Sequence, residues 1–303
     1  MIVILSGGTG TPKLLQGLME ILHPKEISVI VNTSEDHWLS HGYFSPDVDT
    51  VLYTLSGIID ERTWHGINDD TYHTHNRLLK LGYNELLKIG DLDRATHIQR
   101  GNMMKEGVTL SDVISQQAKN LGIKSRVFPM SDDPVETVIH TSQGQMSFHE
   151  YLINYRGKPS ISGVSFNGIE QARASAGALK AIQKSEGVII GPSNPISSIL
   201  PIVSIKKLRE SLQSRRNRVA ISPIILGNPV SGPADKFLSG KGYDCSSKSV
   251  ADIYKGLIDF FIVENNESMP QHELEVIQTN ILMKNLADKE RLAKFTMDVL
   301  GLF

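Results

Sequence analysis

The sequence predicts an α/β fold of the Rossmann-like type, with a mostly parallel sheet flanked by helices and a largely helical insert. Three observations indicate this class. The chain opens with an apolar run, a glycine-rich turn and a segment of helical periodicity. A second apolar run, Ile27–Val31, follows closely, and short apolar runs alternate with helical stretches further along. A strand, helix, strand order of this length favours parallel strands joined by a right-handed crossover.

Each element follows from its own pattern. The opening MIVIL predicts a buried strand, and leucines at helical spacing between residues 14 and 22 predict the helix after it. Later strands are predicted at Ser125–Phe128, Val188–Ile190 and Val219–Ser222. Helices are predicted over Gly168–Lys184, Ile205–Leu212, Val250–Val263 and His272–Leu302.

Two stretches depart from this alternation. Residues Thr71–Lys119 have apolar residues at helical spacing and no strand alternation, so we expect residues 43–120 to form a helical insert over the active-site rim. Residues 137–167 predict a hairpin-like excursion. We therefore expect residues 1–303 to form one α/β domain with this insert.

Composition excludes several classes of protein. Hydrophobic residues make up 40% and charged residues 21%, which excludes a disordered, collagen-like or coiled-coil chain. The 31 Lys and Arg are balanced by 33 Asp and Glu, so no overall positive field attracts nucleic acid or an anionic membrane. The single cysteine excludes a disulfide-stapled fold, and the apolar start is too short for a signal peptide or membrane span. We expect a cytoplasmic protein.

A glycine-rich loop follows the first predicted strand and begins the first helix. It comprises Ser6, Gly7, Gly8, Thr9, Gly10, Thr11, Pro12 and Lys13. Glycines let the backbone approach a phosphate closely, a helix N-terminus favours an anion, and Lys13 adds positive charge. The spacing matches neither a Walker A loop nor G-x-G-x-x-G. The alternative is a tight turn whose glycines only permit close packing.

Two aspartates, Asp47 and Asp49, belong to polar stretches after the second predicted strand. The carboxyl ends of parallel strands meet at one edge of the sheet, so these carboxylates are expected beside the glycine loop. They are suited to hold Mg²⁺ or to accept a proton from a hydroxyl nucleophile, with Asp36 as a further candidate. For Asp47 the alternative is a helix N-cap, because Ser45-Pro46-Asp47 is typical of a helix start. Because a loop carboxylate contributes little to a core, Asp49→Ala is expected to fold normally.

Two further motifs lie later in the chain. Asp93, His97 and Arg100 fall on one face of a predicted helix, which is typical of a solvated face. For His97 the alternatives are a proton carrier and a structural histidine with its own hydrogen-bond partners. The loop Gly191–Ile199 follows a strand, and its Ser193, Asn194, Ser197 and Ser198 offer donors to phosphoryl oxygens. The alternative for this loop is a proline-rich turn with capping serines.

The motifs occur in a fixed order along the chain. They are Leu5–Gly10 with Lys13, Asn32–Thr33, Asp47–Tyr53, Gly90–His97, Gly191–Pro195, and Ser222–Ile224 with Gly232–Asp235. In this combination the sequence resembles the 2-phospho-L-lactate transferase family of coenzyme F420 biosynthesis, CofD, over nearly its whole length.

The resemblance implies a Mg²⁺-dependent enzyme. Such an enzyme moves the phospholactyl group from lactyl-2-diphospho-5′-guanosine to the ribityl hydroxyl of Fo, the 7,8-didemethyl-8-hydroxy-5-deazariboflavin. It gives coenzyme F420-0 and releases GMP. The resemblance also implies that Asp49 and Lys88 contact Fo. The family often has Gly-Asp-Arg-Asp where this chain has Gly90-Asp91-Leu92-Asp93, so Arg94 is a candidate to replace the usual arginine.

Residues and resemblance together give a set of expected roles. We expect the donor to be bound by Gly7, Gly8, Thr9, Gly10, Lys13, Ser193 and Asn194. We expect Asp47 and Asp49 to be catalytic and to hold Mg²⁺, with Asp49 and Lys88 binding Fo. The partners would be the two small-molecule substrates and a second copy in a homodimer, without nucleic acid or membrane.

The sequence leaves two alternative functions. One is a nucleotide-sugar-binding regulator of the YvcK type, which would not bind Fo. The other is an NAD-dependent dehydrogenase, which is disfavoured by the missing third glycine and by Asn32 at the end of the second strand.

Overall fold

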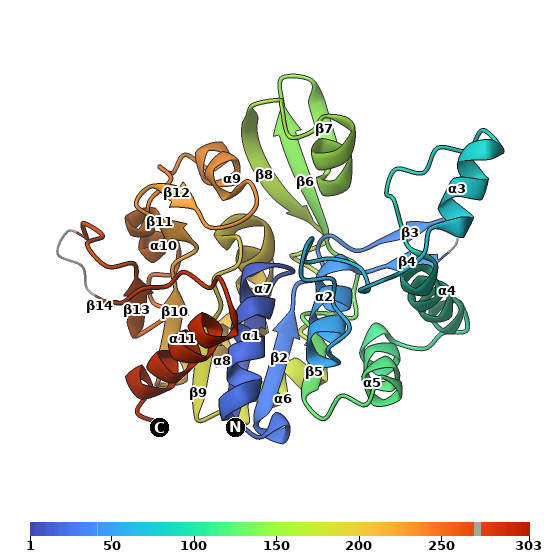
Figure 1. Ribbon diagram of the computed structural model, residues 1–303. Helices are drawn as coiled ribbons and strands as arrows, with labels where there is room; N and C mark the ends of the chain where they lie inside the picture. Colours follow the sequence, from blue (N-terminus) through green and yellow to red (C-terminus); the bar gives the residue numbers. More distant parts are fainter. Residues whose placement is uncertain (41, 270–273) are drawn as a thin grey trace.

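The computed structural model describes residues 1–40, 42–269 and 274–303, and a central sheet with helices on both faces organises the chain (Figure 1). All the strand pairs of this sheet are parallel. Its seven strands run in the order β14 (Glu275–Gln278), β13 (Phe260–Val263), β10 (Arg218–Ile221), β9 (Gly187–Ile190), β1 (Ile2–Ser6), β2 (Ile27–Val31) and β5 (Arg126–Pro129). The predicted α/β class with a parallel sheet is confirmed.

The central strands are apolar because both of their faces are covered. Every residue of β1, β2 and β9 is buried, and Ile4 of β1 pairs with Val29 of β2 and Ile189 of β9. Strands buried on both faces have continuous apolar runs instead of alternation. This explains why the sequence pattern located these three strands.

Two hydrophobic cores lie on opposite faces of the sheet. The first is formed with α1 (Gly10–Ile21), α2 (Pro46–Leu55), α5 (Leu110–Asn120) and α11 (Leu286–Val299). The second is formed with α6 (Ala176–Lys184), α7 (Leu200–Ser204), α8 (Lys206–Gln213), α9 (Ala234–Gly240) and α10 (Ser247–Ile253). Within the described ranges, no helix has the length and hydropathy needed to cross a bilayer.

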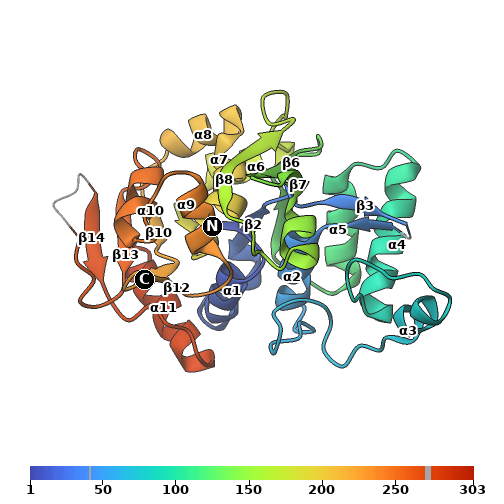
Figure 2. The same ribbon diagram turned by 90° about the horizontal axis from the view of Figure 1, so that it is seen from above.

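Smaller elements surround the sheet. The antiparallel unit of β6 (Glu136–Thr141), β7 (Gly144–Ser147) and β8 (Ile161–Asn167) rises above it in Figure 1, and α3 (His73–Lys80) and α4 (Asp91–Lys105) lie beyond the β5 edge in both views (Figure 2). Two hairpins complete the strands, β3 (His37–Leu39) with β4 (Gly42–Phe44) and β11 (Ile224–Ile225) with β12 (Asn228–Pro229). Short helical turns occur at Pro24–Glu26, Glu150–Asn154 and Pro195–Ile199.

Several local predictions are confirmed. Helices α3, α4 and α5 occupy the stretch predicted to be helical, and β6 to β8 occupy the predicted hairpin region with one strand more than a hairpin needs. The division into one domain with an insert at residues 43–120 stays a prediction.

Three helix predictions were wrong in part. The stretch Val250–Val263 ends as strand β13, and β14 lies inside the stretch predicted as a helix from His272, a residue outside the described ranges. Both strands have four residues, too few for periodicity to distinguish them from helix. In Gly168–Lys184 the helix begins only after Ser175, whose hydroxyl accepts a hydrogen bond from the Ala178 N–H and caps it.

Candidate active site

Two cavities lie on either side of the first turn of α2. One is lined by residues that directly follow β1, β2 and β9, and is here called the glycine-loop cavity. The other is lined by Asp49, and is here called the Asp49 cavity. The first therefore lies at the carboxyl ends of the central strands, where open parallel sheets bind ligands.

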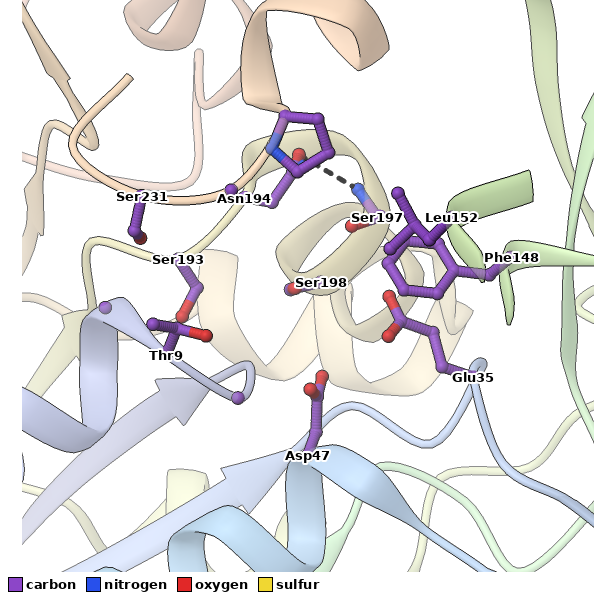
Figure 3. Close-up of a pocket in the computed structure, with 14 residues that line it drawn as sticks. Thr9, Glu35, Asp47, Phe148, Leu152, Ser193, Asn194, Ser197, Ser198 and Ser231 are labelled. Atoms are coloured by element: carbon purple, nitrogen blue, oxygen red, sulfur yellow. Dashed lines mark hydrogen bonds between the residues drawn. The ribbon is translucent and has the colours of Figure 1, made fainter. Parts of the chain in front are cut away.

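The glycine-loop cavity has a volume of about 220 Å³ (Figure 3). Its walls are backbone, hydroxyl groups, two carboxylates and two large apolar side chains. The lining residues are Gly8, Thr9, Gly10, Glu35, Asp47, Phe148, Leu152, Ser193, Asn194, Ser197, Ser198, Ser231, Gly232 and Pro233. Of the predicted donor-binding residues, the structure thus brings Gly8, Thr9, Gly10, Ser193 and Asn194 together.

The glycine loop and the loop after β9 contact each other directly. The Ser193 hydroxyl accepts a hydrogen bond from the Gly7 N–H at 3.1 Å and lies 2.7 Å from the Thr11 hydroxyl. A Cβ at Gly8 would overlap the Asp47 carboxylate, and one at Gly10 would overlap the Pro192 carbonyl. The glycines are therefore needed for close packing, and this same packing keeps the backbone at the cavity wall.

Asn194 has a structural task besides lining the cavity. Its side-chain oxygen accepts hydrogen bonds from the N–H groups of Ile196 and Ser197, which caps the turn Pro195–Ile199. The capping interpretation of this loop is therefore correct for that oxygen.

Two carboxylates, Glu35 and Asp47, face the glycine-loop cavity. Asp47 Oδ2 accepts a hydrogen bond from the Asn32 amide at 3.0 Å. Burial raises the pKa of Asp47 to about 7, although Asn32 and the Gly8 N–H oppose the shift. Burial and the nearby Asp47 charge raise the pKa of Glu35 well above its ordinary value. Ionisation of both groups at once is therefore costly.

Sequence reasoning missed Glu35. It lies in the polar stretch after β2, but no spacing distinguishes it from Asp36 beside it. In the structure, Asp36 accepts a hydrogen bond from the Ser45 hydroxyl at 2.7 Å, whereas Glu35 lines the cavity. The one feature of the sequence that could have indicated Glu35 is its place in the polar stretch after a predicted strand.

The Asp49 cavity is smaller, with a volume of about 60 Å³. Its lining residues are Phe44, Pro46, Asp49, Thr50, His65, Gly66, Leu87, Lys88, Ile89 and Asp93. The ammonium of Lys88 lies 4.0 Å from the centre of the Tyr72 ring, a cation–π distance. The structure thus brings the predicted pair Asp49 and Lys88 to one cavity.

Asp49 is held by two buried basic side chains. The Arg100 guanidinium donates to both carboxylate oxygens, with Nη1 3.1 Å from Oδ2. The His97 Nε2 lies 3.2 Å from Asp49 Oδ2 and 3.2 Å from Asp93 Oδ1. Burial opposes the ionisation of Asp49, but Arg100 and His97 outweigh it and lower its pKa to about 2. Burial likewise disfavours the imidazolium of His97, yet Asp49 and Asp93 raise its pKa to about 9.

The solvated-face interpretation of the helix from Asp93 to Arg100 was wrong. His97 and Arg100 are fully buried. The Gln117 side-chain oxygen accepts a hydrogen bond from Arg100 at 3.0 Å, and the Tyr53 hydroxyl donates to Asp93 at 2.8 Å. These partners come from α2 and α5, so the sequence of α4 alone could not reveal them.

The expectation that Asp47 and Asp49 share one Mg²⁺ ion does not fit this arrangement. Asp47 and Asp49 are two residues apart on α2, so their side chains point in different directions and line different cavities. The ligand atoms of Asp49, Asp93 and His97 do lie within 4.8 Å of one another. However, Arg100 and protonated His97 already balance the two carboxylate charges there.

Two other basic residues lie away from the expected places. The Lys13 ammonium lies over the Trp64 ring at 5.1 Å, and Lys13 is absent from the described lining of the glycine-loop cavity. The Arg94 guanidinium donates to both carboxylate oxygens of Glu85, at 2.7 and 2.8 Å, and both side chains are nearly buried. That pair anchors the segment before α4.

Known proteins are similar to this chain along almost its whole length. The family model described as 2-phospho-L-lactate transferase CofD matches residues 2–301. The 2-phospho-L-lactate transferase of Methanothermobacter thermautotrophicus is 46% identical, covering 98% of this chain and 97% of that protein. The one of Methanocaldococcus jannaschii is 44% identical, covering 99% and 98%.

A solved structure shares the fold. A UPF0052 family protein from Bacillus halodurans superposes with a TM-score of 0.67 at 16% identity, covering 98% of each chain. At that identity the likeness concerns the fold alone. The family model and the relatives, in contrast, span almost the full chain. The chain therefore belongs to the 2-phospho-L-lactate transferase family, CofD.

Proposed function

We propose that the protein transfers the 2-phospho-L-lactyl group from lactyl-2-diphospho-5′-guanosine to the ribityl hydroxyl of Fo, giving coenzyme F420-0 and GMP. One observation carries the proposal. Asp47 lines the glycine-loop cavity, and Asp49, two residues further along α2, lines the cavity that also contains Lys88. Donor and acceptor would meet across this single helical turn.

The donor diphosphate is assigned to the glycine-loop cavity. Backbone N–H groups at the start of α1 and the hydroxyl groups of the loop after β9 suit phosphoryl oxygens. Gly8, Thr9, Gly10, Ser193 and Asn194 would contact the donor, while Gly7 positions Ser193. Lys13, which lies over Trp64, would contribute only long-range positive charge.

The acceptor Fo is assigned to the Asp49 cavity. With a pKa of about 2 and both oxygens facing basic groups, Asp49 stays ionised and is a poor proton acceptor at neutral pH. Its role would be a fixed hydrogen-bond acceptor for a hydroxyl of Fo. Lys88 would face the polar side of the same substrate.

The reaction forms one P–O bond and breaks another. The hydroxyl oxygen of Fo attacks the phosphorus that bears the lactyl group, the bond to GMP breaks with its electron pair on the GMP phosphate, and the hydroxyl proton passes to water. A loose transition state needs positioning and charge stabilisation more than a strong base. Mg²⁺, when bound, would neutralise charge on the diphosphate. Asp47 suits this ion, because its carboxylate faces the donor cavity; Asp49 does not, because Arg100 occupies it.

A single-turnover assay tests the proposal. The purified protein is mixed with guanylated phospholactate, Fo and Mg²⁺, and the products are separated by mass. We expect equal amounts of coenzyme F420-0 and GMP. Hydrolysis of the donor without transfer to Fo would reject the proposal. A fluorescence titration with Fo adds a second criterion, since binding of a guanine nucleotide without binding of Fo would favour a nucleotide-binding regulator.

Three expectations accompany this proposal. We propose a cytoplasmic homodimer in which residues 43–120 form an insert of a single domain. Sedimentation of the purified protein at several concentrations measures its oligomeric state, and a monomer throughout would contradict the homodimer.

A further inference from the structure

Lys88 lies in the segment that connects α3 to α4, residues 81–90, here called the Lys88 segment. The segment contains no helix or strand. Among the described residues, the backbone of residues 86–88 forms no hydrogen bond with another backbone group. Such a segment samples many conformations unless side-chain contacts restrain it. Leu87, Lys88 and Ile89 nevertheless line the Asp49 cavity, so the place of this part of the cavity wall depends on those contacts.

The two helices on either side of the segment are fixed to each other at their N-termini. In Figures 1 and 2, α3 and α4 lie side by side at one end of the molecule. Asp70, just before α3, accepts hydrogen bonds from two backbone N–H groups in the first turn of α4, at 2.9 and 3.0 Å. Asp91, at the start of α4, accepts them from two N–H groups in the first turn of α3, at 2.8 and 3.0 Å. These caps hold the helices together but do not hold the middle of the Lys88 segment.

Glu85 joins the middle of the segment to both helices. Its two carboxylate oxygens accept hydrogen bonds from Arg94 of α4, at 2.7 and 2.8 Å, and its Oε2 lies 3.0 Å from the His75 Nδ1 of α3. The side chains of Glu85 and Arg94 are each 6% exposed. A bidentate pair of guanidinium and carboxylate fixes orientation as well as distance, and burial protects it from screening by salt. Glu85 is therefore the anchor of the Lys88 segment.

The position of the Lys88 ammonium depends on this anchor. Lys88 comes three residues after Glu85, and its ammonium lies 4.0 Å from the centre of the Tyr72 ring at the start of α3. We propose that Glu85, held by Arg94 and His75, is a positioning residue for Lys88: it fixes the Lys88 segment so that the ammonium contacts the acceptor bound in the Asp49 cavity. The identity of that acceptor, Fo, rests on the proposed function.

A double-mutant cycle, followed by the fluorescence of Fo, tests whether Glu85 acts through Lys88. Glu85→Gln should raise the Kd for Fo by about five- to tenfold, up to the effect of Lys88→Ala alone, because the released ammonium no longer contacts Fo. In a Lys88→Ala background, Glu85→Gln should change this Kd by less than about twofold. Equal effects in the two backgrounds would overturn the proposal, since a general loss of structure or of charge would weaken Fo binding with or without Lys88.

Arg94→Lys separates the geometry of the pair from its charge. Lysine keeps the positive charge, but a single ammonium cannot form the bidentate pair. Arg94→Lys should therefore weaken Fo binding to within about twofold of the effect of Glu85→Gln. Asp133→Asn is the matched control, because Asp133 forms a bidentate pair with Arg173 and lines neither cavity, and it should leave the Kd for Fo within about twofold of the wild type. A wild-type Kd in folded Arg94→Lys would reject the positioning role.

Trypsin cleavage after Lys88, measured without Fo, tests the anchor independently of the reaction. Glu85→Gln and Arg94→Lys should each speed this cleavage by about tenfold, because cleavage requires the segment to open locally. Asp133→Asn should leave the rate within about twofold of the wild type. Circular dichroism identifies any variant that does not fold, and if Glu85→Gln is unfolded, Arg94→Lys decides both measurements. An unchanged rate of cleavage in the folded variants would reject the anchor.

The outcomes separate this inference from the proposed function. Faster cleavage in both variants, in a protein whose wild type binds no Fo, would support the anchor and reject Fo as the acceptor. Fo binding by the wild type that neither variant weakens would support the acceptor site and reject Glu85 as a positioning residue.

Discussion

Asp49 is a buried residue whose carboxylate is fixed by Arg100 and His97. Its position is in the first turn of α2, not in a loop, and this changes the expected effect of its replacement. Asp49→Ala would leave the fully buried Arg100 without its main partner. We expect a loss of stability of about 3 to 5 kcal/mol together with the loss of transfer. The expectation that Asp49→Ala folds normally is wrong, because Asp49 is buried and paired with Arg100.

Urea denaturation measures this cost. Glu210→Ala is a suitable control, because Glu210 forms an exposed ion pair with Lys207 and its loss should change stability by less than about 1 kcal/mol. Equal stability of the Asp49 and Glu210 variants would contradict the role given to the Arg100 pair.

His97 makes stability depend on alkaline pH. Its pKa is raised to about 9 in the native state by Asp49 and Asp93, against about 6.5 when unfolded. The stabilisation is therefore fully present below about pH 6.5 and is lost as pH rises through 9. His97→Gln should lower stability near pH 6 by on the order of 2 kcal/mol and remove this component of the alkaline decline.

The free energy of unfolding of the wild type and of His97→Gln is measured between pH 6 and pH 10. The difference between wild type and His97→Gln isolates the histidine from other groups that titrate in this range. A difference that stays constant with pH would show that His97 is not charged in the folded state.

Lys88 lines the Asp49 cavity, to which we assign the acceptor Fo. Lys88→Ala removes a positive charge from the wall of the Asp49 cavity but leaves the glycine-loop cavity unchanged. We expect KM for Fo to rise by about tenfold, because the substrate loses one charge-assisted hydrogen bond, and KM for the donor to change little. Steady-state kinetics at varied Fo measure this, and Lys80→Ala at the exposed end of α3 serves as control. An unchanged KM for Fo would exclude Lys88 from the acceptor site.

At the scale of elements, the contact between the glycine loop and the loop after β9 leaves no room for a side chain at Gly10. Gly10→Ala should be destabilising by about 1 to 3 kcal/mol, because the added methyl group would overlap the Pro192 carbonyl. Gly163→Ala in β8 is a matched control, since its nearest neighbours, atoms of His140, lie at ordinary contact distance. Thermal unfolding of both variants decides the point, and equal unfolding temperatures would show that the loops can separate.

The sequence predicted some elements better than others for a physical reason. β1, β2 and β9 were found because continuous burial gives continuous apolar runs. β14 is the edge strand of the sheet and β13 lies next to it. Each has only four residues, and not all of them are buried, so their sequence pattern cannot be distinguished from that of a helical turn. The loops after the strands were predicted as ligand-binding from topology, and the structure does place their residues at one cavity.

The site was predictable only where its residues directly follow neighbouring strands of the parallel sheet. The glycine loop and Ser193 follow adjacent strands, so their approach follows from a parallel sheet. The pairing of Asp49 with Arg100 depends on how α4 packs beside α2, which no local pattern contains. The division of Asp47 and Asp49 between two cavities required the orientation of α2.

At the scale of the whole molecule, the two cavities are built from different parts of the chain. Segments 8–10 and 193–198 line the first, whereas segments 65–66 and 87–93 contribute to the second. GDP should therefore slow amide exchange in the first pair of segments, and Fo in the second pair. Hydrogen–deuterium exchange with each ligand alone tests this assignment. Protection of the same segments by both ligands would contradict separate cavities.

The spacing of Asp47 and Asp49 has a consequence for how the chain tolerates changes in length. Each residue of an α-helix turns the chain by about 100°, so one inserted or deleted residue after Asp47 would swing Asp49 away from Arg100 and Lys88 while Asp47 stayed beside Gly8. Substitutions around this turn can be absorbed by their neighbours, but a shift in register cannot. The first turn of α2 therefore fixes the relative positions of the carboxylates that line the two cavities, the proposed donor and acceptor sites.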